Sequence, residues 1–258
     1  MSFKIDAEDL DYKTLNAELR KYLKEADSSR IEEIILKGVL GQRYIGDGLK
    51  DNVKIIIHGT PGNNMGAFMD GPSLEVFGNG QDGIGNTMNS GKIIIHGDGG
   101  DILGYSLRGG EIYIEKNVGF RCGIHMKSYK DKMPVIVIGG SAGNFLGEYM
   151  AGGIIIVLGM YNQDFSHFPY NIKSRIVGDF IGTGMHGGII YISKKVEKYK
   201  LGKEVKVMEL DGSDRSILEK YTNNYCNYFE INKSKIPTEN FIKLIPYSHR
   251  PYGKLYTY

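Results

Sequence analysis

The stretch that decides the fold is Gly97–Ile114, "GDGGDILGYSLRGGEIYI". Its first half is rich in glycine and aspartate, which favour turns, and its second half alternates as a β-strand does. Variants of this stretch recur on both sides of it, so we interpret it as one unit of an internal repeat. Seven glycines mark equivalent points of successive units: Gly46, Gly66, Gly85, Gly104, Gly123, Gly147 and Gly182.

The spacings between these glycines are 20, 19, 19, 19, 24 and 35 residues. The two long intervals contain the polar stretches "KSYKDKMP" (127–134) and "MYNQDFSHFPYNIKSR" (160–175). Such insertions are expected where a loop leaves an otherwise regular unit, because loops run over the surface and tolerate added residues.

Alignment of the units on their glycines gives chemically uniform columns. The residue before each glycine is apolar or cysteine: Ile45, Met65, Ile84, Leu103, Cys122, Leu146 and Ile181. The third residue after it is also apolar: Leu49, Met69, Met88, Leu107, Met126, Met150 and Met185. Positions eight and ten after it are aliphatic: Leu74/Val76, Ile93/Ile95, Ile112/Ile114, Ile155/Val157 and Ile190/Ile192. The residue between each pair varies, as an outward strand position does: Glu75, Ile94, Tyr113, Ile156 and Tyr191.

A unit of about 19 residues cannot bury its apolar side alone, whereas stacked units bury a continuous core. The columns therefore predict a mainly β protein, a single-stranded right-handed parallel β-helix of about seven rungs spaced ~4.8 Å apart. The right hand follows the rule for parallel crossovers. The corner glycines are expected to adopt positive φ.

The distribution of glycine predicts three regions. Of 36 glycines, none lies in 1–37 and three follow residue 192. We expect residues 1–37 to form a strand–helix–strand cap, 38–192 the β-helix, and 193–258 a C-terminal helix and an extended docking tail. Caps would cover the open sheet edges at both ends. The C-terminal helix is expected to begin at Ser216, because Ser216 and Glu219 have capping-box spacing.

Composition narrows the class of protein. The apolar content is 41%, the charged content 24% and the net charge +2, so neither nucleic acid nor a membrane surface is indicated as a partner. The N-terminus does not resemble a signal peptide, and the longest apolar run, "IIIVLGM" (154–160), is too short to span a bilayer. Cys122 and Cys226 form neither a CxxC pair nor a metal-ligand spacing. A cytoplasmic location is expected.

Asp82 and Asp101 are the strongest candidates for chemistry, because they occupy one column on adjacent rungs. A carboxylate pair could serve acid–base catalysis or bind a divalent cation, as in solenoid enzymes that act on polysaccharides. The other interpretation is that these aspartates bond to their own backbone in Asx-turns. Asn63 and Asn144 in the same column favour the turn interpretation.

The remaining candidates indicate structure rather than catalysis. "GNGQDG" (Gly78–Gly83) matches the dinucleotide pattern GxGxxG, but the next residues predict another rung and no helix. His58 and His96 share a column two rungs apart, ~10 Å, which is too far to share a metal. His125, His167 and His186 have no ligand partner at metal-binding spacing, and Cys122 is interpreted as a core residue. No catalytic, cofactor-binding or metal-binding residue is predicted.

Three phrases resemble the GXGXG domain, the C-terminal β-helix of the large subunit of glutamate synthase: "GQRYIGDGL" (41–49), "GEYMAGGIIIVLG" (147–159) and "GTGMHGGIIYI" (182–192). "GNGQDGIGNTMNSG" (78–91) and "SHRPYGKLYTY" (248–258) resemble the free-standing, archaeal-type version of this domain. The repeat is also similar to the β-helix chain of formylmethanofuran dehydrogenase and to complexes that make N-methylglutamate.

The resemblance implies a non-catalytic subunit that holds an amidotransferase chain and an FMN-binding glutamate synthase chain in register for ammonia transfer. FMN and the iron–sulfur cluster would belong to those partners and not to this chain. No active residue of the family can be carried over, since this chain has neither an N-terminal cysteine nor a cysteine cluster. The aromatic tail Tyr247–Tyr258, which includes Arg250, and the insertion Asn162–Pro169 are predicted to contact partners.

Overall fold

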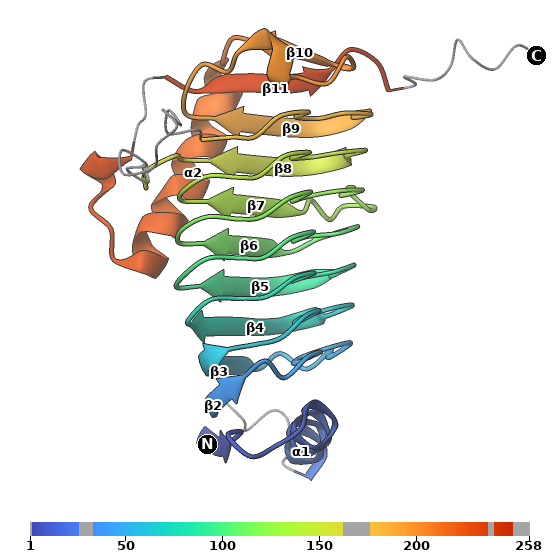
Figure 1. Ribbon diagram of the computed structural model, residues 1–258, viewed down its shortest axis with the longest axis vertical. Helices are drawn as coiled ribbons and strands as arrows, with labels where there is room; N and C mark the ends of the chain where they lie inside the picture. Colours follow the sequence, from blue (N-terminus) through green and yellow to red (C-terminus); the bar gives the residue numbers. More distant parts are fainter. Residues whose placement is uncertain (1, 26–32, 162–175, 237–239, 250–258) are drawn as a thin grey trace, which may run out of the picture.

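The computed structural model describes residues 2–25, 33–161, 176–236 and 240–249, and it shows a tall coil built on one 11-stranded sheet (Figure 1). Strands β1 to β9 follow one another in sequence order along the sheet, and each pairs in parallel with the next. Their bounds are β1 Ser2–Asp6, β2 Glu33–Leu40, β3 Lys54–Thr60, β4 Asp70–Phe77, β5 Ser90–Ile95, β6 Glu111–Ile114, β7 Val135–Ile138, β8 Ala151–Val157 and β9 Gly187–Ile192. This arrangement is a β-solenoid, as the repeat predicts.

The register of the strands confirms the aligned columns. One row of paired residues runs Ile55, Leu74, Ile93, Ile112, Ile136, Ile155 and Ile190 along the sheet. The residues before the corner glycines and three after them are all buried. Like side chains from successive coils therefore lie one above another and fill the interior, as expected for stacked repeats.

The number of turns is slightly lower than predicted. The seven corner glycines enclose six complete repeat intervals. The solenoid therefore has about six turns, whereas the sequence predicts about seven. All seven corner glycines have φ between +66° and +77°. At Gly104 a Cβ atom would lie 2.6 Å from Cδ1 of Ile136 in the coil above, so both the backbone conformation and the close approach require glycine.

The N-terminal end of the coil contains the predicted strand, helix and strand. Helix α1 (Tyr12–Glu25) directs Leu15, Leu19 and Leu23 into the same apolar cluster that fills the solenoid. Strands β1 and β2 add to the sheet rather than forming a separate layer. The core consequently continues without a break from the N-terminal helix into the coil.

The C-terminal end differs from the expectation of a helix and an extended tail. Strand β11 (Ile242–Pro246) pairs antiparallel with β9, and β10 (Val205–Met208) pairs antiparallel with β11. Short 3₁₀ helices η3 (Lys198–Lys200) and η4 (Lys233–Lys235) lie in the connections. Two antiparallel strands thus close the end of the parallel sheet. Residues 250–258 of the predicted docking tail, and the insertion Asn162–Pro169, lie outside the described residues.

Helix α2 (Gly212–Phe229) begins four residues before the predicted start at Ser216. Its N-cap is Asp211, whose side chain accepts hydrogen bonds from the backbone N–H groups of Ser213 and Asp214, and Asp214 bonds back to the N–H of Asp211. The capping box therefore consists of two aspartates, and the Ser216–Glu219 assignment is wrong. Aspartate caps a helix as well as serine does, so the spacing at Ser216 did not discriminate.

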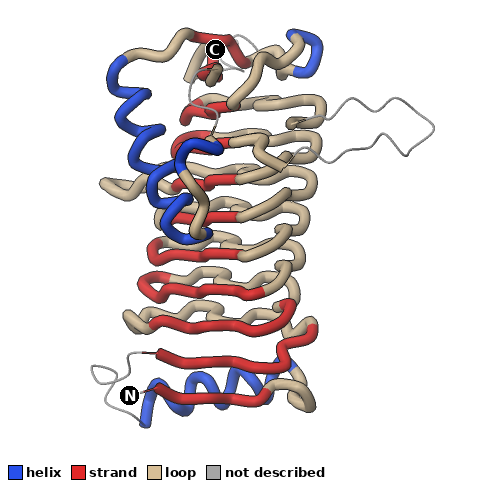
Figure 2. The backbone as a smooth tube through the Cα atoms, turned by 90° about the vertical axis from the view of Figure 1, so that its left-hand side faces the viewer, coloured by secondary structure: helices blue, strands red, loops and turns tan. Residues whose placement is uncertain are grey.

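Helix α2 stands against the outward face of the strands in the upper part of the coil (Figure 2). It covers outward positions such as Tyr113, Ile156 and Tyr191, each 0% exposed, with Leu218, Tyr221 and Tyr225 of its own. These strand positions do point outward as predicted, but they belong to a second apolar core. No helix in the described part of the chain is long and apolar enough to cross a membrane.

Candidate functional surfaces

The carboxylates of Asp82 and Asp101 bond to the backbone of the next coil. Asp82 Oδ1 accepts from the N–H of Asp101 at 2.8 Å, and Asp101 Oδ1 accepts from the N–H of Phe120 at 2.7 Å. Asn63 and Asn144 make the same contact with the residues that follow them in this column, at 3.2 and 2.9 Å. The side chains of this column therefore form a ladder of hydrogen bonds between successive turns of the solenoid. The interpretation that they bond to the backbone of their own turn, as Asx-turns do, is wrong.

A second ladder of the same kind lies nearby. Asn79 accepts from the N–H of Asp98, Asp98 from that of Asn117, and Asn117 from that of Ser141, at 2.9 to 3.0 Å. Side-chain oxygens here satisfy backbone donors that the sheet does not reach. Short polar side chains are therefore required at these corners for structural reasons.

The glycine pattern and the histidines occupy structural positions. Gly78–Gly83 connects β4 to a corner that leads into β5, so no helix N-terminus is present to receive a pyrophosphate. The ring of Phe77 is stacked between His58 and His96, with ring centroids 5.2 and 4.4 Å away. His96 Nε2 lies 3.1 Å from Oε1 of Glu75. His167 lies outside the described residues.

Both cysteines are buried and free. Cys122 lies inside the coil, and burial raises the pKa of its thiol, as expected of a core residue. Cys226 belongs to α2 and packs into the second apolar core, where burial also raises the pKa of its thiol. Among the described residues no group of three or more His, Cys, Asp or Glu side chains could hold a metal ion.

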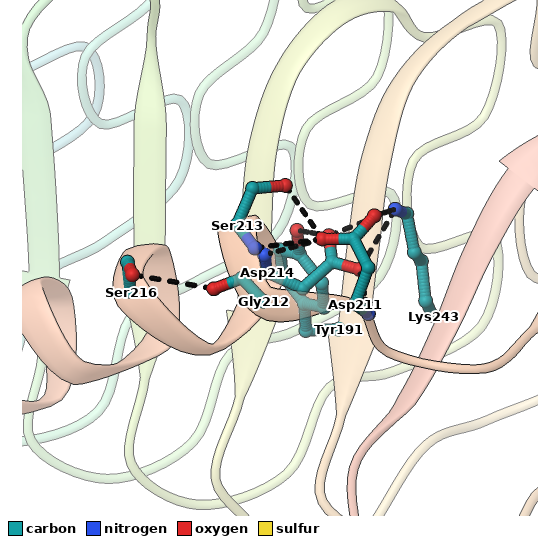
Figure 3. A network of polar contacts seen from close by, with 7 residues as sticks. All are labelled: Tyr191, Asp211, Gly212, Ser213, Asp214, Ser216 and Lys243. Atoms are coloured by element: carbon teal, nitrogen blue, oxygen red, sulfur yellow. Dashed lines mark hydrogen bonds and ion pairs between the residues drawn. The ribbon is translucent and has the colours of Figure 1, made fainter.

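A buried polar network anchors the N-terminus of α2 to the end of the coil (Figure 3). Asp214 is 1% exposed and accepts hydrogen bonds from the hydroxyl of Tyr191 at 2.6 Å and from Nζ of Lys243 at 2.8 Å. Because Tyr191 belongs to β9 and Lys243 to β11, the network ties three elements together. Sequence reasoning missed it, since its members are 23 and 29 residues away from Asp214.

The network perturbs the titration of its members. Burial raises the pKa of Asp214, but the hydrogen bonds from Lys243, from Tyr191 and from the Asp211 backbone outweigh burial and leave that pKa below its ordinary value. The hydrogen bond to Asp214 correspondingly raises the pKa of Lys243. The ionised pair is therefore the stable form at neutral pH.

The remainder of α2 fits closely onto the strands. The hydroxyl of Tyr225 donates to the backbone oxygen of Glu115 at 2.6 Å, and Asn224 donates to the hydroxyl of Tyr113 at 3.1 Å. A Cβ atom on Gly139 would lie 1.8 Å from the Tyr225 hydroxyl, so this strand end requires glycine beneath the helix. The inner face of α2 is thus held against the strands by hydrogen bonds and apolar contacts within the chain.

One edge of the coil carries an unusual set of backbone conformations. The positions two before and two after each corner glycine are left-handed, and most of them are not glycine. We call this edge the corner ridge; it consists of these left-handed residues and the residues next to them in sequence at each corner. Its left-handed non-glycine members are Tyr44, Asn64, Phe68, Thr87, Ile102, Ser106, Arg121, His125, Phe145, Tyr149 and Phe180. Bulky and β-branched residues rarely adopt this conformation, which marks the ridge as a candidate functional surface.

The corner ridge is also apolar and exposed. Its exposed large side chains are Tyr44, Phe68, Ile102, Tyr105, Phe120, Tyr149 and Phe180, between 36% and 56% accessible. The rings stack from coil to coil: His125 on Tyr149 at 5.3 Å, and Phe145 on Phe180 at 4.9 Å. Arg121 lies over the ring of Phe145 at 4.9 Å and pairs with Glu148 at 3.3 Å. An exposed apolar surface of this extent is typical of an interaction site.

The comparisons with known proteins agree with this architecture. A family model described as the GXGXG motif matches residues 13–247, which include all seven corners. The chain belongs to the GXGXG family. An uncharacterized protein of Methanocaldococcus jannaschii is 49% identical to this GXGXG chain over 257 residues, covering 98% of this chain and 95% of the relative.

Proposed function

We propose that this GXGXG chain is a non-catalytic structural subunit of a glutamate-synthase-like complex, which converts glutamine and 2-oxoglutarate to glutamate. In this proposal the chain holds an amidotransferase chain and an FMN-binding synthase chain in register for ammonia transfer. FMN and an iron–sulfur cluster belong to the partner chains. Membership of the GXGXG family, which occurs in glutamate synthase, supports the proposal.

The observation that best supports this structural role is the stacking of like residues along the whole solenoid. Corner columns and strand columns lie in register from β3 to β9, so the body is a straight spacer whose outer positions recur at ~4.8 Å. A spacer of this kind suits a subunit that fixes the distance between two partners. The candidate acids Asp82 and Asp101 already hold adjacent coils together.

Affinity purification of the tagged chain from its native cells, with mass spectrometry of the chains that co-purify, tests the proposal. We expect an FMN-containing synthase chain and an amidotransferase chain, and we expect assembly in the cytoplasm. Recovery of molybdenum or tungsten enzyme subunits would instead place the chain in a formylmethanofuran dehydrogenase. Recovery of an N-methylglutamate synthase would identify the third complex.

Reconstitution separates a structural role from a catalytic one. Adding this chain to the two partner chains is expected to raise glutamate formation from glutamine and to leave glutamate formation from free ammonia unchanged. If the isolated chain hydrolyses a polysaccharide, and Asp101→Asn abolishes that turnover, the chain is a carbohydrate-active solenoid and the proposal is wrong.

A further inference from the structure

One outward column of the sheet changes from polar to apolar along the solenoid. The paired residues of this column are, in order, Lys54, Ser73, Lys92, Glu111, Val135, Ile154 and Ile189. Val135 is 0% and Ile154 3% exposed, whereas Ile189 is only partly buried. The upper part of the column is therefore built to be covered, and the cover is incomplete at its upper end.

A groove of about 430 Å³ lies at this place. Four isoleucines from four elements line it: Ile154 of β8, Ile189 of β9, Ile217 of α2 and Ile245 of β11. Met133, which is 55% exposed, adds to the lining from the hairpin at 127–134. The volume falls within the ~300–1,000 Å³ that is usual for binding pockets. The groove can therefore take up large apolar side chains.

The wall of the groove also contains an interruption of the sheet. Gly152, Gly153 and Gly188 line the groove, and the pairing of β8 with β9 shifts register between Ala151 and Ile154. Two glycines of β8 thus lie opposite one glycine of β9, and a bulge of this kind leaves its extra residue out of the ladder. Because glycine has no side chain, the backbone at the bulge is open to the groove. A hydroxyl or an extended chain in the groove can form hydrogen bonds there.

The chain itself arrives at this groove. Strand β11 ends at Pro246, on the side of the sheet where β8 and β9 begin, and both Pro246 and His249 belong to the lining (Figure 1). Nδ1 of His249 donates a hydrogen bond to the backbone oxygen of His186, 2.9 Å away, just before β9. Residues 250–258, "RPYGKLYTY", follow directly. Three tyrosines and a leucine therefore continue the chain from the rim of an apolar groove.

We propose that residues 250–258 dock into this groove of their own chain. From β11 past β9 and β8 to the hairpin, the groove extends over three strand spacings, ~15 Å. Three residues span at most ~10 Å, so Tyr252 comes within reach of Ile189. Three residues further on, Leu255 comes within reach of Met133. Tyr258 lies past the end of the groove.

A segment that is joined to the rim has an advantage over any separate occupant. A short flexible link gives the segment an effective concentration in the ~mM range, so that weak contacts suffice to keep the groove filled. A partner chain would have to displace this segment before it could use the groove. The tyrosines that composition alone assigns to contact with a partner thus have apolar surface to cover within their own chain.

Tryptophan fluorescence of the full chain tests the proposal. The chain contains no tryptophan, so a single introduced one reports on its own surroundings. In Tyr252→Trp the emission maximum should lie at a shorter wavelength than that of a solvated indole, and acrylamide should quench the emission several-fold less. In Tyr258→Trp both properties should match a solvated indole, because this residue lies past the groove. Equal protection at the two positions, or protection at neither, overturns the proposal.

Substitutions in the groove test whether it is the docking site. Combined with Tyr252→Trp, Ile189→Lys should raise acrylamide quenching to the level of a solvated indole, because it places a cation where the ring docks. Met133→Lys changes an exposed side chain and should do the same to Leu255→Trp. Met208→Lys, at a 42% exposed position of β10 outside the groove, is the matched control and should change neither signal.

Circular dichroism checks that each variant is folded, and Met133→Lys decides the question if Ile189→Lys does not fold. Quenching that is unaffected by a folded groove variant overturns the proposal. The segment would then be available to a partner chain, as its composition predicts. These measurements use this chain alone, so their outcome is independent of the proposed complex.

Discussion

Glycines at the corners of this coil serve two separable purposes. Gly104 has φ +69°, and a Cβ atom there would lie 2.6 Å from Cδ1 of Ile136. Gly48 has φ +60°, but nothing lies within 4 Å of the position that its Cβ would take. The first glycine therefore provides both backbone freedom and space for the coil above, whereas the second provides backbone freedom alone.

This difference predicts unequal effects of the same substitution. Gly48→Ala should lower the free energy of unfolding by about 1–2 kcal/mol, the cost of a left-handed residue with a Cβ. Gly104→Ala should lower the free energy of unfolding by ~1–3 kcal/mol more than Gly48→Ala does, because the methyl group crowds Ile136. Urea denaturation of both variants measures the difference. Equal losses would show that coil-to-coil crowding does not determine the choice of glycine.

The polar corners show what residue patterns can and cannot predict. The repeat placed Asp82 and Asp101 in one column with Asn63 and Asn144, and this indicated a backbone role. It did not indicate that each side chain reaches the next coil, because a bond to a residue 19 positions away depends on how the coils stack. The strain of the corner ridge was likewise not predictable, since Phe68 and Tyr149 carry no sequence sign of positive φ.

At the scale of single elements, the sequence predicted that α2 is a helix but not where it begins or where it docks. Its apolar face was evident, whereas its start and its docking site depended on Asp211 and Asp214. A capping box of two aspartates departs from the usual Ser/Thr–Glu pattern. Strand β11 was missed because it is short and pairs antiparallel with the last coil, so it has no counterpart in the repeat.

The anchor of α2 predicts a definite dependence of stability on pH. Asp214 has a pKa below its ordinary value of 3.8 in the folded chain, so its contribution is present above that value and is lost as pH falls through the folded pKa. Lys243 has a pKa raised above 10.5, so its contribution is lost as pH rises beyond that range. Stability from this pair should be constant between those limits.

Asp214→Asn should lower the free energy of unfolding at neutral pH by about 3 kcal/mol or more, because it leaves the ammonium of Lys243 without its buried partner. The loss of stability between about pH 5 and about pH 2 should also become shallower than in the unsubstituted chain. Thermal unfolding across this pH range measures both effects. Asp131→Asn, on the exposed hairpin at 127–134, is the matched control. If both variants show the same pH profile, Asp214 does not anchor α2 by charge.

At the scale of the whole molecule, the chain is a linear array. The strands lie in the order β1 to β9 and then β11 and β10, so each coil pairs with the coil before it and the coil after it. The repeat made this body predictable, because every column is reinforced by several equivalent residues. The ends were less predictable, because each cap occurs once and must fit a single terminal coil.

In a linear array, a substitution that destabilises one end is expected to lower the stability of the nearby turns and not of the distant ones. Leu19 of α1 is 1% exposed and packs into the N-terminal end of the core, so Leu19→Ala should cost about 2–5 kcal/mol there. Native-state hydrogen exchange should show faster exchange of amides in β1 to β3 and unchanged exchange in β7 to β9. Leu40→Ala, at an 82% exposed position of β2, should change neither region. An equal increase in exchange rate in all turns would mean that the solenoid opens as one cooperative unit. The loss of stability at the N-terminal cap would then lower the stability of every strand in the sheet.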